Sequence, residues 1–88
     1  MQRPSAGEIE AETRQAMENI RAVLERHGSA LSRVIKCTAM LADMSEWVAM
    51  NRVYMDYFPD HLPARSAFGT TGLALGARVE IEAIALAD

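Results

Sequence analysis

The chain has 88 residues, 50% of them hydrophobic, and a formal net charge of −3, so it is long enough for one small domain. The acidic balance and the lack of a Lys/Arg cluster make nucleic-acid binding unfavourable, and the apolar excess favours burial against another subunit. A single cysteine excludes an internal disulfide, and no apolar run approaches the roughly 20 residues that span a bilayer, so we expect a cytoplasmic protein without a membrane segment.

The first predicted element is an amphipathic helix that begins at Glu8, after a flexible lead-in over residues 1–7. Gly28 is a suitable residue to end it, because glycine accepts the left-handed conformation common after helices. The helix carries one stripe of side chains at spacings of three or four, which comprises Ile9, Thr13, Met17, Ile20, Leu24 and His27.

An apolar strand is predicted next, over residues 33–42. Asp43 or Ser45 can cap the second helix that follows, and Pro59 ends that helix because the residue before proline avoids helical geometry. One side of this helix is lined by Trp47, Met50, Tyr54, Tyr57 and Phe58.

Two further strands are predicted over residues 64–70 and 78–87, joined by a turn or bulge over residues 72–76. The order helix, strand, helix, strand, strand predicts an α+β fold in which two helices pack on one face of a sheet. Apolar residues occur in both alternating sets of the last strand, so both sheet faces require cover. The helices cover one face, and a neighbouring subunit is expected to cover the other.

Two charged residues stand out as candidates for chemistry. Arg65 follows Pro63 at the mouth of a strand, and arginine is well shaped to hold a carboxylate by two parallel hydrogen bonds. Glu80 lies inside a strongly apolar strand, where an ionised group is rare unless it is paired or active. Together they suggest chemistry on a small acid.

Structural roles remain open for each candidate at this point. Arg65 can be an ion-pair partner of Glu82 or Asp60, and Glu80 can pair with Arg78 or Arg65 across the sheet. Asn51, on the second helix, can be a plain surface amide.

The remaining reactive side chains give no sign of a catalytic or metal site. Cys37 has no base placed to activate it and is expected to be a small buried apolar residue. His27 and His61 lack metal-ligand spacing. A serine-hydrolase elbow and a phosphate-binding glycine loop are absent from the sequence.

Several segments in order resemble the RidA family, also called YjgF/YER057c/UK114. The resemblance runs from about Gly7 to Ala85. It is carried by residues 13–20 (TRQAMENI), 34–38 (VIKCT), 51–54 (NRVY), 63–66 (PARS) and 76–85 (GARVEIEAIA).

This resemblance implies a chorismate-mutase-like fold assembled as a homotrimer, with the sheets inward and ligand pockets between subunits. It also implies hydrolysis of enamines and imines that pyridoxal-phosphate enzymes make from serine or threonine. The substrates would be 2-iminobutanoate or 2-iminopropanoate and the products a 2-oxo acid and ammonia, with no cofactor or metal required.

Carried over residue by residue, the resemblance gives three site residues. Arg65 matches the arginine that grips the substrate carboxylate, Glu80 the glutamate that handles the attacking water, and Asn51 a pocket asparagine. Two features depart from the family pattern. Ala67 stands where cysteine is common, and the family's usual N-terminal β-hairpin, with its pocket tyrosine and Ser-Gly segment, has no counterpart in this sequence, which is expected to be a natural short form, a fragment or a mis-started reading frame.

Two other functions compete with the imine deaminase. One is a non-catalytic trimer that binds small carboxylates or partner proteins. The other is the ribonuclease or translation-inhibiting activity attributed to some family members, against which the acidic balance argues.

Overall fold

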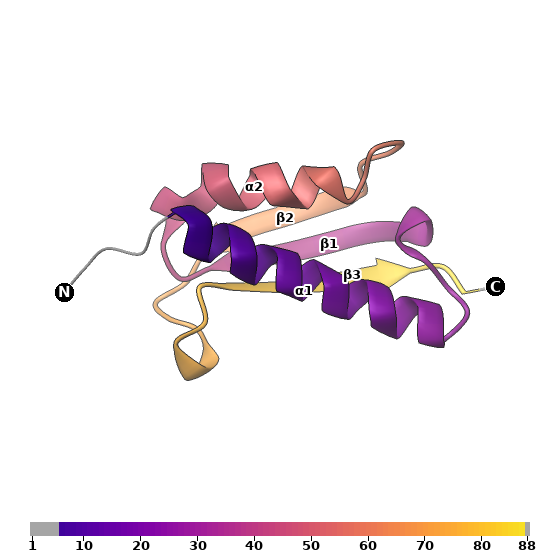
Figure 1. Ribbon diagram of the computed structural model, residues 1–88, viewed down its shortest axis with the longest axis horizontal. Helices are drawn as coiled ribbons and strands as arrows, with labels where there is room; N and C mark the ends of the chain where they lie inside the picture. Colours follow the sequence, from indigo (N-terminus) through magenta and orange to yellow (C-terminus); the bar gives the residue numbers. More distant parts are fainter. Residues whose placement is uncertain (1–5, 88) are drawn as a thin grey trace.

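The computed structural model describes residues 6–87 and shows two helices packed on one face of a three-stranded sheet (Figure 1). The α+β layer predicted from the sequence is confirmed. In chain order the elements are α1 (Ala6–Arg26), β1 (Val34–Leu41), α2 (Trp47–Asp56), β2 (Ala64–Gly69) and β3 (Val79–Ala85), with 3₁₀ turns at Leu31–Arg33, Met44–Glu46 and Ala74–Gly76.

Helix α1 starts earlier than its sequence pattern indicated. It begins at Ala6, so Gly7 is helical and does not belong to a lead-in; the rest of that predicted lead-in, residues 1–5, lies outside the described residues. Ile9, Thr13 and Met17 are fully buried, as the stripe predicted. His27 does not continue the stripe: it lies beyond the helix end and is exposed, because Gly28 turns the chain away with a φ of +80°.

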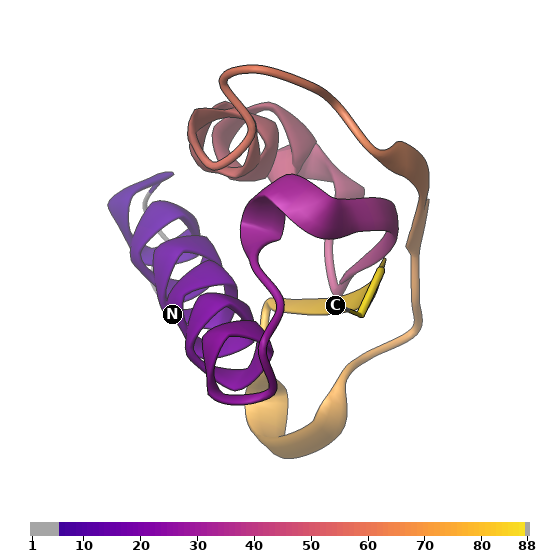
Figure 2. The same cartoon turned by 90° about the vertical axis from the view of Figure 1, so that its right-hand side faces the viewer.

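Strand β1 is the centre of the sheet, and it pairs in parallel with β2 and antiparallel with β3. A parallel pair needs a crossover connection, which α2 supplies. Asp43 is the residue that caps the turn into α2, since its side chain accepts a hydrogen bond from the Ser45 backbone N–H at 2.9 Å. Figure 2, which looks along the layer, shows α1 and α2 beside one another on the same side of the strands.

The two faces of the sheet differ in burial because successive side chains of a strand point to opposite sides. The residues turned toward the helices are buried or half-buried; they are Cys37, Ala39 and Leu41 of β1, Arg65 and Ala67 of β2, and Val79, Ile81, Ala83 and Ala85 of β3. The other face, here called the open face, carries Thr38, Met40, Ser66, Phe68, Glu80, Glu82 and Ile84.

The open face carries exposed apolar side chains beside polar ones, and Lys36 is among the polar ones. Phe68 is 46% exposed and Ile84 is 60% exposed, and Met40 lies between Phe68 and Glu80 in the register of the sheet. No described element packs over these side chains. That a second subunit covers them stays a prediction.

Candidate functional site

Arg65 is held by side chains of α2. It is the second residue of β2, and its side chain is turned toward the helices. Its Nη1 donates a hydrogen bond to Oδ1 of Asn51 at 2.6 Å. Its guanidinium carbon lies 4.7 Å from the centroid of the Trp47 ring and 4.6 Å from that of the Tyr54 ring. The structure thus brings two predicted site residues, Arg65 and Asn51, into direct contact.

The three side chains of α2 that contact Arg65 share one face of the helix. Trp47, Asn51 and Tyr54 stand at positions i, i+4 and i+7, so they lie one above another. Each cation–π contact is worth about 0.5–1 kcal/mol at an exposed site and more when water is excluded. Asn51 occupies one of the five N–H donors of Arg65, which leaves in-plane donors for a second planar acceptor such as a carboxylate.

The alternative in which Arg65 pairs with Glu82 receives no support. Glu82 lies on the open face, where it is paired in register with Thr38, so the sheet separates it from the guanidinium. Arg78, the alternative partner of Glu80, instead binds Glu8 at 2.6 Å and Glu46 at 3.4 Å.

Beneath Arg65 lies a buried pair, Cys37 and Tyr54. Cys37 is the register partner of Arg65 in the sheet. Burial raises the pKa of the Cys37 thiol, and the Tyr54 hydroxyl and the Arg65 charge partly oppose this. Burial and the neighbouring thiol likewise raise the pKa of Tyr54. The buried Tyr54 Oη has no hydrogen-bond partner among residues 6–87. Cys37 is therefore a buried neutral residue, as predicted.

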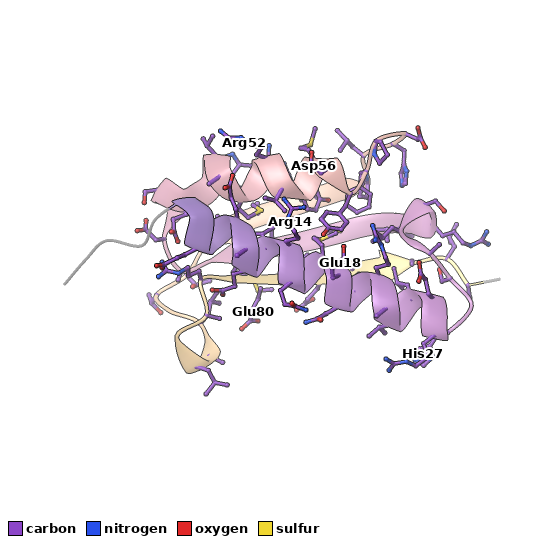
Figure 3. The ribbon with its side chains drawn as sticks, viewed as in Figure 1. Arg14, Glu18, His27, Arg52, Asp56 and Glu80 are labelled. Carbon is purple, nitrogen blue, oxygen red and sulfur yellow. The ribbon has the colours of Figure 1, made fainter. Side chains whose placement is uncertain are left out.

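Glu80 lies elsewhere. It is exposed, on the open face, in a row with Met40 and Phe68. Figure 3 shows its side chain on the far side of the molecule from Arg52 and Asp56, which stand on α2.

Arg65 and Glu80 do not meet within one chain. Arg65 pairs with Cys37 and Glu80 pairs with Met40, so they are three residues apart along β1 and on opposite faces. They are also two strands apart, which is about 10 Å in the hydrogen-bonding direction. A site that uses both residues has to be completed by a second copy of the chain.

The sheet has a separate cavity at its β3 edge. This cavity of about 230 Å³ is lined by Asn19, Ile20, Val23, Leu24 and Ala83, and it includes none of the three predicted site residues. Within residues 6–87, no three His, Cys, Asp or Glu side chains are grouped so as to hold a metal ion. The helices of the same region include none long and apolar enough to cross a membrane.

Comparison with known proteins identifies the family. The sequence model described as Endoribonuclease L-PSP matches residues 2–87. Curated relatives and solved structures of the YjgF type match over most of the chain. The chain belongs to the RidA family.

Particular relatives of this RidA-family chain show the extent of the match. A RutC family protein of Pyrococcus horikoshii is 47% identical over 79 residues, which are 90% of this chain and 63% of the relative. The 2-iminobutanoate/2-iminopropanoate deaminase of Mus musculus is 40% identical over 88 residues, covering 94% of this chain and 65% of the enzyme. The crystal structure of the E. coli YjgF gene product superposes with a TM-score of 0.84 at 31% identity, covering 89% of this chain and 64% of that one.

These comparisons confirm the fold and the family expected from the sequence. The RidA-family chain spans less than two thirds of the length of these curated relatives. The activity and the assembly of the full-length relatives are therefore proposed for this chain below.

Sequence reasoning missed two residues of the Arg65 site. The sequence placed Trp47 and Tyr54 only on one side of the second helix. Tyr54 is buried, and both rings contact the Arg65 guanidinium. Their spacing with Asn51 was visible in the sequence. What was not visible is that β2 places an arginine opposite that face of α2.

Proposed function

We propose that this protein hydrolyses small 2-imino acids, such as 2-iminobutanoate and 2-iminopropanoate, to 2-oxo acids and ammonia. Arg65 anchors the substrate carboxylate, with Asn51 beside it, and Glu80 handles the attacking water. The observation that carries the proposal is the Arg65 guanidinium, which is fixed by Asn51, Trp47 and Tyr54 and retains donors for a carboxylate. Relatives named as deaminases of these imines support it.

The separation of Arg65 and Glu80 supports a site that is shared between two subunits. In a closed ring of copies, the edge of the sheet formed by β2 in one subunit can meet the open face of the next. Each site then takes Arg65 from one chain and Glu80 from its neighbour. The exposed Phe68 and Ile84 supply apolar surface for that contact. We propose a homotrimer, in line with the RidA resemblance, and its cytoplasmic location stays a prediction.

The proposed reaction is the hydrolysis of an iminium. With its carboxylate on Arg65, the substrate presents the imine carbon to a water held by Glu80, which removes much of the entropic barrier. The water oxygen bonds to that carbon, the C=N electron pair moves to nitrogen, and a water proton passes to Glu80. The amino group then takes a proton from Glu80 and leaves as ammonia. The hydroxyl oxygen forms the C=O bond and gives its proton to the Glu80 carboxylate, which releases it to water.

A direct assay tests the activity. A threonine dehydratase generates 2-iminobutanoate in the cuvette, semicarbazide traps the remaining imine, and loss of trapped product reports its hydrolysis. We expect the purified chain to lower the trapped fraction and Glu80→Gln to do so much less, because the amide can hold a water but cannot accept its proton. Hydrolysis at the rate of buffer alone would refute the deaminase.

The oligomeric state is tested separately by sedimentation equilibrium at micromolar concentration. A trimer mass is expected. A stable, folded monomer would remove the intersubunit site from the proposal.

A second candidate is supported by the separation of the two residues. A chain with Arg65 held by α2 and Glu80 on another face can bind a small carboxylate without hydrolysing anything. Binding of 2-oxobutanoate without imine turnover would favour this binding module. An RNA-cleaving role has no comparable support, because the net charge is −3 and phosphate binding requires grouped cations.

A further inference from the structure

We propose that Glu12 of α1 is a positioning residue for Glu80, acting by fixing the first residues of β3. The inference rests on the proposed function, since it assigns Glu80 a role in turnover. The contacts come from a group of four side chains, here called the β3 anchor: Glu8, Glu12, Glu46 and Arg78.

Glu12 binds the backbone of β3 at its start. One of its oxygens, Oε1, accepts hydrogen bonds from the backbone N–H of Arg78 at 2.6 Å and of Val79 at 3.3 Å. A carboxylate that accepts from two backbone donors makes charge-assisted hydrogen bonds, which are shorter and stronger than neutral ones. Glu12 and Arg78 stand 66 positions apart in the chain, so this contact ties the helix layer directly to the strand.

Arg78 is held through its side chain and its backbone oxygen as well. Its Nη2 lies 2.6 Å from a Glu8 oxygen, and its Nη1 lies 3.4 Å from an oxygen of Glu46, whose side chain is only 11% exposed. Its carbonyl accepts from the Ala42 backbone N–H at 3.0 Å. The anchor thus joins α1, the turn before α2 and the end of β1 at a single residue.

Glu80 follows this residue by two positions, which makes the anchor relevant to its placement. The segment before Arg78 is an irregular loop in which Leu75 and Gly76 both have positive φ, so the loop gives β3 little regular support. A reacting group must be held within about 0.5 Å of its productive position. β3 is also held by its pairing with β1, in which Glu80 stands opposite Met40, and the carboxylate of Glu12 adds a second restraint at the start of the strand.

The test compares three variants of the purified chain. Glu12→Ala removes the acceptor, Glu12→Gln keeps a carbonyl oxygen that can accept from the same N–H groups, and Glu10→Ala is the matched control. Glu10 is also a glutamate of α1, but it binds Arg52 on α2 at 3.4 Å. The readouts are kcat and KM for 2-iminobutanoate, the dissociation constant of 2-oxobutanoate, and the exchange rates of the Arg78 and Val79 amide hydrogens by NMR.

We expect Glu12→Ala to lower kcat about 10- to 100-fold, the range for a misplaced reacting group, with the affinity for 2-oxobutanoate unchanged because Arg65 is untouched. Amide exchange at residues 78 and 79 should become faster. Glu12→Gln should keep most of the parent's kcat, and its amide exchange at residues 78 and 79 should be slower than in Glu12→Ala. Glu10→Ala should match the parent in both measurements.

An unchanged kcat in Glu12→Ala would overturn the inference. A loss of 2-oxobutanoate affinity as large as the loss of kcat would also overturn it, because Glu12 would then support the fold as a whole and not the position of Glu80. An inactive parent would refute the proposed function, and the positioning role with it. An active parent with a fully active Glu12→Ala would refute only the role of Glu12.

Discussion

Arg65 and Glu80 point to opposite faces of the same sheet. Arg65 stands opposite Cys37 on the helix side, and Glu80 stands opposite Met40 on the open face. They stand 15 positions apart in the chain, yet no rotamer change within one subunit brings them together, because β1 lies between their strands. The proposed chemistry therefore requires two copies of the chain, one to supply each residue.

Mixed trimers test whether Arg65 and Glu80 act from different subunits. We expect Arg65→Ala chains and Glu80→Gln chains each to be inactive alone and to regain activity when refolded together. In a randomly mixed ring, an interface with an intact Arg65 from one chain and an intact Glu80 from the next forms in about one quarter of cases. The measurement is the initial rate of imine hydrolysis, relative to the parent refolded in the same way.

A site made within one chain predicts a different result for this mixture. Every chain would then lack one of the two residues, and the mixed sample would stay as inactive as either variant. A mixture of parent chains and Arg65→Ala chains, refolded in the same way, serves as the control for activity lost during refolding.

Arg65→Lys is expected to bind 2-oxobutanoate far more weakly than the parent. An ammonium cannot reproduce the planar, two-pronged contact, and it gives up the hydrogen bond to Asn51 and the stacking over the aromatic rings. Loss of one such charged anchor costs about 2–5 kcal/mol of binding free energy. Isothermal titration calorimetry measures this loss, and the control is Arg52→Lys, at an exposed arginine of α2. Equal affinities for Arg65→Lys and the parent would exclude Arg65 as the carboxylate anchor.

The stability of the fold should decline in alkaline solution. Burial raises the folded-state pKa of both Cys37 and Tyr54, so their neutral forms are favoured by folding. That stability is complete below the unfolded pKa values, near 8.5 for a thiol and 10 for a phenol, and is lost as the pH rises toward the folded values. The expected loss from Tyr54 is about 1 kcal/mol at pH 10.5, measured by urea unfolding.

Tyr54→Phe isolates that contribution. At pH 7.5 its free energy of unfolding should be close to that of the parent, because the hydroxyl it removes is buried without a hydrogen-bond partner among the described residues. Its decline between pH 8 and pH 10.5 should be shallower than that of the parent. If the free energies of unfolding of Tyr54→Phe and the parent declined in parallel, ionisation of Tyr54 would not contribute to the loss of stability.

Leu75→Gly should stabilise the chain. Leu75 is fully exposed and has a φ of +58°, a conformation that costs a residue with a Cβ about 1–2 kcal/mol. Glycine removes this strain but adds freedom to the unfolded chain, so a gain of about 0.5–1 kcal/mol is expected in urea unfolding. Leu62→Gly, at an exposed residue without positive φ, should destabilise. A loss in Leu75→Gly would mean that the leucine packs against another subunit.

The sequence by itself determined the helices, the strands and the family. The spacing marked Ile9, Thr13 and Met17 as one buried stripe, and Gly28 and Pro59 follow the ends of α1 at Arg26 and of α2 at Asp56. These features are local: the period of a helix or strand and the conformational limits of glycine and proline act over a few residues. The family followed from ordered segments that need no knowledge of contacts.

Only the tertiary structure decided which side chains share a surface. The period of two in a strand divides each strand into two sets, but strand order, direction and register decide which sets face the helices. Those choices put Arg65 against Trp47, Asn51 and Tyr54, sent Glu80 to the open face, and brought Glu12 to the start of β3. They arise from burying one apolar face under two helices, a balance over the whole chain that no local pattern contains.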